Sequence, residues 1–281
     1  MNVTDEFEAH RAHLRGVALH MLGSPSDAED AVQEAWLRAG RAAPDDVANV
    51  RGWLTTVVAR ICLDMLRART SRRERPLDEK VPEPAAPGPE QDAALADSVG
   101  LALLVVLDKL EPPERLAFVL HDVFGVPFDE IATMLGRTSE ATRQLASRAR
   151  RRVQGAPEGT APEGGVSDLA GRRAVVGRFL AALRAGDVAG LAAVLAPDVT
   201  IVADDGSETR GRAWARSAAA FSRHAAFIEA ALVDGAPGAI LAPKGKLQSA
   251  LRFAIAGDAI VRVEIVAGPA RVAALEVALL G

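Results

Sequence analysis

Two stretches rich in proline and glycine divide the chain. "VPEPAAPGPEQ" at 81–91 has prolines at positions 82, 84, 87 and 89. A helix interior does not accept prolines at this density, because each one removes a backbone N–H and clashes with the preceding turn. "GAPEGTAPEGG" at 155–165 combines glycine and proline in the same way. The sequence therefore predicts folded parts at 1–75, 92–154 and 166–281, joined by a Pro-rich linker at 76–91 and a Gly/Pro linker at 155–165.

The first part is patterned as helices. Apolar residues recur at helical spacing over 5–22, 27–41 and 51–75. "GSPS" at 23–26 ends the first helix, and Ser26 or Asp27 is expected to cap the second. This pattern predicts a compact three-helix domain.

The second part contains a helix-turn-helix pattern. Residues 92–123 are helical in character, with a break at Pro112-Pro113 that fits a helix start. A short helix around Ile131 then meets Gly136, and Thr138 or Ser139 can cap a further helix. Helix, glycine turn and capped helix are typical of DNA-binding domains.

The third part changes from helical to strand periodicity. Two helices are expected over 168–196, a short strand at 199–204 and a helix at 212–224. Four strands at hairpin spacing follow between 227 and 268, the last two joined by Gly257-Asp258, and a helix at about 269–280 ends the chain. Helices followed by an antiparallel sheet predict an α+β domain.

Charge alternates strongly along a chain of net charge −4. Residues 1–50 carry four arginines against nine acids, and residues 81–136 carry two basic residues against ten acids. Between and after them, residues 51–75 have seven arginines against two acids, and residues 137–152 have six against one. Two such basic islands are the electrostatic footprint expected of nucleic-acid contact.

Other kinds of site are disfavoured. The one cysteine, Cys62, and the five histidines show no metal-ligand spacing, so we expect no metal and no cofactor. No apolar run reaches about 18 residues, and the N-terminus has early acids and no apolar core. We therefore expect a cytoplasmic protein with no membrane partner.

Specific segments resemble a known family. "LGSPSDAEDAVQEAWLR" and "RGWLTTVVARICLDMLRAR" resemble sigma region 2, and "LEPPERLAFVLHDVFGVPFDEIATMLGRTSEATRQLASRARRR" resembles sigma region 4. The chain thus resembles a bacterial RNA polymerase sigma factor of the extracytoplasmic-function class. The last part resembles a SnoaL-like domain, cone-shaped and NTF2-like, which regulates the sigma factor in cis in one subgroup. The resemblance implies two all-α sigma domains followed by an α+β domain, with core RNA polymerase and promoter DNA as partners and no catalytic residue.

Candidate DNA-binding residues lie on both basic islands. In the recognition helix, Glu140, Arg143, Gln144 and Ser147 face away from the apolar stripe, where side chains such as Arg and Gln read base edges. Arg148, Arg150, Arg151 and Arg152 suit phosphates. The resemblance implies that region 2 reads single-stranded bases, with Asp45, Asp46 and Asn49 on base edges and Arg60 and Arg67 on the backbone. Trp53 fits either base stacking or the core. The full set is Asn49, Arg60, Arg67, Thr138, Ser139, Glu140, Arg143, Gln144, Ser147, Arg148, Arg150 and Arg151.

A polymerase-binding surface is expected on the second helix. The resemblance implies that an acidic face there docks on core polymerase, whereas helix capping and solvation are the simpler explanation. Its members are Asp27, Glu29, Asp30, Gln33 and Glu34.

The third part departs from the subgroup at its usual motifs. Pro82-Glu83-Pro84 matches the linker motif, but Lys80 and Val81 replace its Trp and Leu. Asp204-Asp205-Gly206-Ser207 stands where an Asp followed by glycines is usual, and Gly268-Pro269-Ala270-Arg271 where Asn-Pro-Asp-Lys is usual. Two alternatives remain open. In the first, the third part is a small-molecule sensor or an isomerase-type enzyme, and Asp198, Asp204, His224 and Glu264 are candidate catalytic groups by residue type alone. In the second, the chain is a transcription regulator that acts without polymerase.

Overall fold

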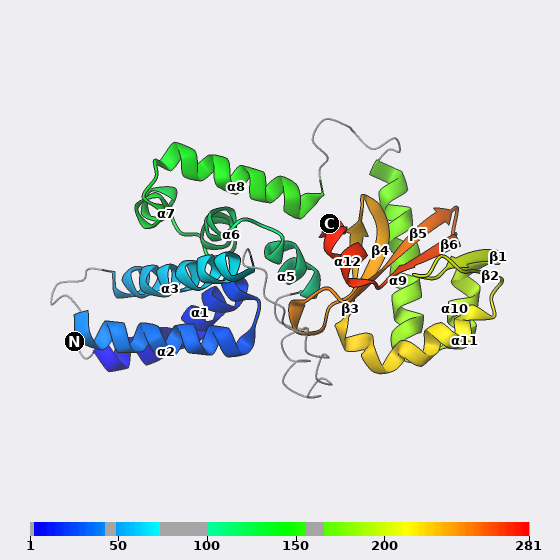
Figure 1. Ribbon diagram of the computed structural model, residues 1–281, viewed down its shortest axis with the longest axis horizontal. Coiled ribbons are helices and arrows are strands. Elements are labelled where there is room, and N and C mark those ends of the chain that lie inside the picture. Colours follow the sequence, from blue (N-terminus) through cyan, green and yellow to red (C-terminus); the bar gives the residue numbers. More distant parts are fainter. Residues whose placement is uncertain (1–2, 43–48, 74–99, 156–165, 281) are drawn as a thin grey trace. The chain divides into compact units, whose positions relative to one another are not determined.

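The computed structural model describes residues 3–42, 49–73, 100–155 and 166–280 (Figure 1). The described residues form two compact units. The first comprises 3–42, 49–73 and 107–150, and the second comprises 100–106, 151–155 and 166–280. The linker motif at 80–84 and the loop holding Asp45 and Asp46 lie outside the described residues.

Three helices begin the first unit: α1 (Val3–Leu22), α2 (Pro25–Ala42) and α3 (Val50–Arg73). Their apolar stripes meet in one core, in which Leu14, Val32 and Leu54 are fully buried. The cap of α2 differs from the expectation. Neither Ser26 nor Asp27 caps it. The helix starts at Pro25, so the Ser24 hydroxyl lies one residue ahead of the first turn and accepts a bond from the Asp27 amide at 3.4 Å.

The helices of the second part also match the prediction. They are α5 (Leu101–Asp108), α6 (Pro112–Phe118), the π-helix η1 (Val119–Val123), α7 (Phe128–Leu135) and α8 (Ser139–Gln154). The helix α6 begins at Pro112, as expected from the proline pair. Gly136 ends α7 at φ 63°, a left-handed conformation that glycine adopts without strain.

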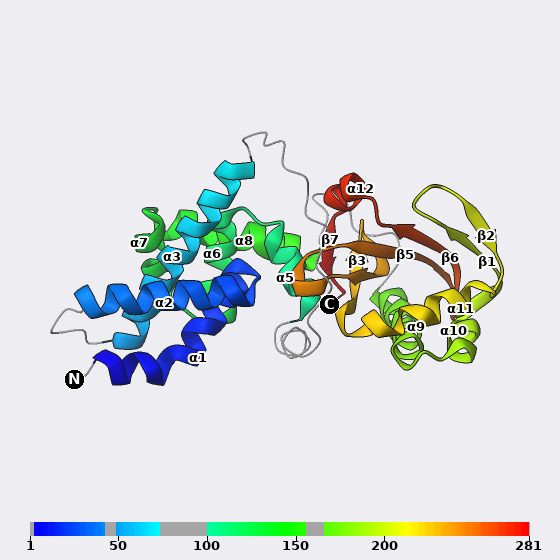
Figure 2. The same ribbon diagram turned by 60° about the horizontal axis from the view of Figure 1, so that its bottom comes forward.

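The second unit contains a curved sheet that is covered on one side by helices (Figure 2). The helical segments are α9 (Val166–Ala185), α10 (Val188–Val194), α11 (Trp214–Ala219), the 3₁₀-helices η2 (Ala220–Phe227) and η3 (Pro243–Gly245), and α12 (Pro269–Ala274). The strands are β1 (Leu195–Val202), β2 (Glu208–Arg210), β3 (Ile228–Val233), β4 (Ala236–Leu241), β5 (Ser249–Ala256), β6 (Ala259–Val266) and β7 (Val277–Leu279).

The sheet is mixed, in the order β2-β1-β6-β5-β4-β3-β7, and only β1 and β6 run parallel. Its hairpins follow the sequence signals. Gly257-Asp258 joins β5 to β6, as predicted, and Asp234-Gly235, both at positive φ, joins β3 to β4. Val176, Phe179 and Leu183 of α9 pack with Val263 and Phe253 of the sheet in the core of this domain. The predicted fold class is therefore confirmed: two all-α regions are followed by an α+β domain.

Three elements of this domain differ from the expectation. The helix expected at 269–280 stops at Ala274, and the chain then forms β7, because the free edge of β3 offers backbone hydrogen bonds to residues 277–279. The helix expected at 212–224 continues as the 3₁₀-helix η2. The short strand β2 was not predicted, and it pairs with β1.

Candidate nucleic-acid interface

The recognition helix α8 is positioned by its cap and by its buried face. Thr138 is the capping residue, since its hydroxyl accepts a bond from the Ala141 amide at 3.1 Å. The other capping candidate, Ser139, donates instead to the Asp129 carboxylate on α7. Leu145 and Ala146 are buried against Ala117 of α6. The cap and the buried face together fix which side of α8 is presented to solvent.

The four predicted base readers share the exposed side of α8. Glu140, Arg143, Gln144 and Ser147 are all exposed. The Arg143 guanidinium lies 5.6 Å from the centre of the Phe128 ring and 3.9 Å from the Glu140 carboxylate. These two neighbours restrict the side chain without covering it, which suits a group that must meet a base edge in a defined direction.

The predicted phosphate contacts fall into two kinds. Arg148 donates to Glu114 at 3.0 Å, and Arg150 donates to Asp122 at 2.6 Å, so both are engaged by acids of the same unit. Arg151 is exposed and has no ion pair among the residues that the structure describes. Arg151 is therefore the predicted phosphate contact with the fewest ties to the protein.

The other basic island, residues 51–75, lies largely on α3. Asn49 is exposed, and its side-chain oxygen accepts a bond from the Gly52 amide at 2.9 Å, so it caps this helix. Arg60 and Arg67 are exposed, and Arg67 lies 4.0 Å from Asp64. Trp53 is half-buried, which leaves both of its predicted roles open.

The acidic face of α2 is largely paired within the first unit. Asp27 contacts Arg69 of α3 at 2.7 Å, and Glu29 contacts Arg11 of α1 at 2.5 Å. Glu34 pairs with Arg38 on its own helix at 2.8 Å. Asp30 and Gln33 are exposed and have no such pair among the described residues. These two side chains are the part of the face most accessible to a partner.

A buried arginine joins α6 to α1, and no sequence pattern had singled it out. Arg115 is only 2% exposed, donates from Nε to the His20 carbonyl at 3.1 Å, and lies 3.6 Å from Asp108. Burial lowers the pKa of the Arg115 guanidinium to about 10, so it stays charged at neutral pH. The Nη2 atom of Arg115 is buried and has no hydrogen-bond partner among the described atoms.

Two histidines of α1 pack against Phe124, which follows η1. The rings of His13 and His20 each meet Phe124 edge-on, with centroids 5.3 and 5.4 Å apart. Burial lowers the pKa of both histidines, and the positive charge of Arg51 adds to this effect at His13. Both rings therefore favour the neutral form more than a solvent-exposed imidazole does.

The four enzyme-type candidates of the C-terminal domain do not form one site. Asp204 accepts bonds from the Ala267 amide and from Arg271, each at 2.9 Å, and Arg271 also donates to Glu264 at 3.1 Å. The backbone amides of Ala267 and Gly268, and then Arg271, hold the pKa of Asp204 below its usual value. Arg271 thus links the two segments in which this chain departs from the family motifs. Asp198 and His224 are outside this network.

A separate cavity of about 100 Å³ lies between the helices and the sheet of the same domain. Neither Asp198, Asp204, His224 nor Glu264 lines it. Among the described residues, no three His, Cys, Asp or Glu side chains come together as metal ligands, and no helix is long and apolar enough to cross a membrane.

Comparison with known proteins identifies both helical regions. The family model for Sigma-70 region 2 matches residues 7–72, and the model for Sigma-70, region 4 matches residues 100–153. The ECF RNA polymerase sigma factor SigJ of Mycobacterium tuberculosis is 47% identical over 205 residues, a match that covers 71% of this chain and 64% of that protein. The probable ECF RNA polymerase sigma factor SigI of M. tuberculosis is 34% identical, covering 95% of this chain and 93% of the relative. A crystal structure of M. tuberculosis SigJ matches with 34% identity and a TM-score of 0.46, covering 95% of this chain and 97% of that chain.

Proposed function

The chain belongs to the extracytoplasmic-function family of RNA polymerase sigma factors, and from this premise we propose that it binds core RNA polymerase and directs it to two-part promoters. In this role it acts in transcription initiation and does no covalent chemistry in its sigma domains. A location in the cytoplasm, where the chromosome lies, follows from that role.

The main structural support for this proposal is the exposed face of α8. A capped helix offers Arg143 and Gln144 side by side, and such side chains can pair bidentately with guanine and adenine in the major groove. Arg151 adds a cation suited to the neighbouring phosphate. We assign sequence reading of the upstream promoter element to this face, and contact with the downstream element to Asn49, Arg60 and Arg67 on α3.

Reconstituted transcription tests the proposal directly. The full chain and core polymerase are combined with the DNA upstream of the protein's own gene, and transcripts are measured. We expect a discrete start site that requires both protein components. A regulator that acts without polymerase would bind this DNA but add no transcript in the presence of core enzyme, and that result would reject the proposal.

We also propose that the C-terminal domain modulates the sigma regions in cis. A contact within the second unit supports this. The Glu229 carboxylate at the start of β3 accepts a bond from the Ala102 amide at 2.6 Å, at the N-terminus of α5. Residues 100–153 match region 4, so α5 is the helix with which that region begins. A negative charge at a helix N-terminus is stabilising, so Glu229 of the C-terminal domain is expected to stabilise the start of α5, where region 4 begins.

The alternative in which the C-terminal domain is an enzyme receives less support. Acid–base chemistry needs an ionisable group within hydrogen-bond reach of a bound substrate. The 13 residues that line the cavity include no Asp, Glu, His, Lys or Arg. A small-molecule sensor needs no such group, so we prefer the sensor as the role of any ligand-binding activity here.

A further inference from the structure

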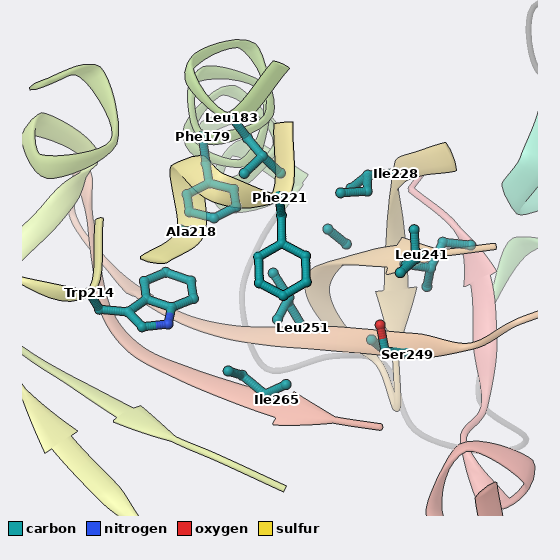
Figure 3. A pocket seen from close by; sticks show the side chains of 13 residues that line it. Phe179, Leu183, Trp214, Ala218, Phe221, Ile228, Leu241, Ser249, Leu251 and Ile265 are labelled. Carbon is teal, nitrogen blue, oxygen red and sulfur yellow. The ribbon is translucent and has the colours of Figure 1, made fainter. Parts of the chain in front are cut away.

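The cavity of the C-terminal domain is lined mainly by aromatic and aliphatic side chains, which come from both the helices and the sheet (Figure 3). Phe179 comes from α9, Trp214 from α11 and Phe221 from η2, while Leu251 and Ile265 come from the sheet. These side chains surround about 100 Å³ of space. An enclosed apolar cavity of roughly 150 Å³ holds benzene. The space here is smaller but open to solvent, so it can take at most a single ring, with part of the molecule lying in the opening.

Polarity limits what can enter. Ser249 is the one hydroxyl among the lining side chains, and the indole N–H of Trp214 is the other hydrogen-bonding side-chain group there. A charged ligand would lose its hydration without gaining an opposite charge, which is costly in an apolar site. A neutral ligand with one hydroxyl or carbonyl group could instead bond to Ser249.

The aromatic rings favour a flat molecule. Phe179 and Trp214 lie nearly parallel, with an interplanar angle of 8° and centroids 6.3 Å apart. Phe221 projects into the space between the helical and sheet walls (Figure 3). A planar ring inserted here would meet aromatic faces and edges, a geometry that adds to the free energy of simple apolar burial.

The segment η2 has features of an entrance. Phe221 lines the cavity yet is 52% exposed, an arrangement that leaves a large apolar group in water. The 3₁₀-helix is eight residues long, whereas runs longer than three or four residues are uncommon. Nδ1 of His224 in the same segment is buried with no partner among the described atoms. A molecule bound against Phe221 would cover part of its ring and remove that part from water.

We propose that this cavity is a receptor site for a small, neutral, planar apolar molecule that carries one hydrogen-bonding group, held between Trp214 and Leu251 with Ser249 as its polar contact. The inference extends the proposed sensor role of the C-terminal domain. Binding itself is independent of promoter recognition, so a failure here would appear in a binding measurement and a failure of the sigma proposal in transcription.

Matched probes test the ligand class on the full chain. Benzyl alcohol and benzoate share one ring and similar size, but only benzoate is charged. Saturation-transfer NMR measures the binding of each. We expect benzyl alcohol to bind at least about tenfold more tightly than benzoate, because the site offers no cation to the carboxylate.

Matched variants test the location. Ala218→Leu places a larger side chain in the cavity wall, and Ala226→Leu makes the same change at an exposed position of η2 outside the cavity. We expect benzyl alcohol binding to weaken about tenfold or more in Ala218→Leu and to stay within about twofold in Ala226→Leu. If Ala218→Leu does not fold, Ser249→Ala serves in its place, and it should weaken benzyl alcohol more than toluene, which lacks the hydroxyl.

The proposal is overturned by any of three results. These are the absence of benzyl alcohol binding to the unaltered chain, equal binding of benzoate, or undiminished binding in both Ala218→Leu and Ser249→Ala.

Discussion

At the scale of single residues, the arginines of α8 are not equivalent, although they are close together in the sequence. Arg148 and Arg150 donate to Glu114 and Asp122 at 3.0 and 2.6 Å, whereas Arg143 has only a longer contact of 3.9 Å with Glu140 and Arg151 has no ion pair among the described residues. A cation that already pairs with a carboxylate must give up part of that pair to meet a phosphate. Base reading and phosphate contact are therefore expected from Arg143 and Arg151 before the others.

Substitutions at these two positions should have different signatures. Arg143→Ala should cost about 1–3 kcal/mol at one base pair of the upstream element and leave other sequences less affected. Arg151→Ala should weaken all sequences alike and make the salt dependence of binding shallower by about one unit. Binding to a set of single-base promoter variants at several salt concentrations checks both. An equal loss on every sequence for Arg143→Ala would contradict its assignment as a base reader.

Cys62 permits a prediction about pH. It is completely buried in α3, and burial raises the pKa of its thiol to about 12. The folded state therefore keeps this proton more tightly than the unfolded chain, whose thiol has a pKa near 9.0. The resulting contribution to stability is present below pH 9.0 and is lost as the pH rises toward 12.

The same burial should protect Cys62 chemically. At about pH 8, we expect an aromatic disulfide reagent to label it at least roughly 100-fold more slowly in the native protein than in urea. The colour released by the reagent measures the rate. Equal rates in the two conditions would mean that α3 opens readily or that the thiol is accessible.

At the scale of elements, the acidic side of α2 has one part that pairs with neighbouring helices and one part that is exposed to solvent. Asp27 and Glu29 face α3 and α1 through their arginine partners, while Asp30 and Gln33 are exposed. The pair of Glu34 with Arg38 lies on the surface, where ion pairs contribute about 0–1 kcal/mol to stability, so changes at Asp30, Gln33 and Glu34 should spare the fold.

Reversal of charge on α2 tests the proposed polymerase contact. We expect Asp30→Arg with Glu34→Arg to weaken binding to core polymerase by more than about 100-fold, because like charges opposed across an interface cost several kcal/mol. Co-elution with core enzyme measures this. Asp258→Arg with Glu276→Arg makes the same change in net charge on the C-terminal domain and should leave binding intact. Full retention of binding by the α2 variant would place the docking surface elsewhere.

The packing of α1 against α6 and η1 should weaken in acid. The pKa values of His13 and His20 are lowered from 6.5 by burial, so the neutral rings favour the folded arrangement above that pH, and stability falls as the pH drops below it. Arg115 adds positive charge near His20, and Arg51 and His10 add it near His13, while the Gly16 carbonyl accepts a bond from His20 and opposes the shift.

Replacement of these histidines by a neutral side chain should reduce the acid sensitivity. The thermal midpoint of the double variant His13→Gln and His20→Gln should fall less than that of the unaltered chain between about pH 7.5 and 5.5. His224→Gln is the control, since His224 lies in η2 and not in α1, α6 or η1. An identical fall in the double variant would exclude these two groups as the cause.

At the scale of the whole molecule, the C-terminal domain shares a structural unit with the two ends of region 4, while residues 107–150 belong to the other unit. Residues 100–106 and 151–155 group with the domain rather than with the other helices, and Glu229 holds the start of α5. Ile228, the neighbour of Glu229 in β3, also lines the cavity. A ligand that moved this strand would act next to the contact with region 4.

Removal of the domain should have a modest effect on transcription. We expect deletion of residues 166–281 to change the output by no more than about tenfold, or about 1.4 kcal/mol of coupling. Glu229→Ala should change it in the same direction and by no more than the deletion, because it removes one contact. Transcription from the same promoter compares them, with Glu276→Ala as the control on an exposed acid. A hundredfold effect of the deletion, or an opposite effect of Glu229→Ala, would contradict this account.

The sequence by itself determined what depends on neighbours along the chain. Apolar spacing located α1, α2 and α3, Gly136 marked the turn before α8, and Gly257-Asp258 marked a hairpin. These features are readable because helix period, caps and tight turns are set within a few residues. The motif segments were sufficient to indicate the family and its two DNA-binding regions.

The tertiary structure alone decided which distant groups meet. Residues 277–279 became a strand because β3 had an unpaired edge, and their local pattern had favoured a helix. Arg148 met Glu114 across 34 residues of sequence, and Arg115 met His20 across 95. The cavity gathers residues from 179 to 265, so its apolar character was visible at no single segment. Backbone pairing at a sheet edge, burial of a charge and the shape of a cavity all depend on chain folding that brings remote residues together, and local periodicity contains no record of those partners.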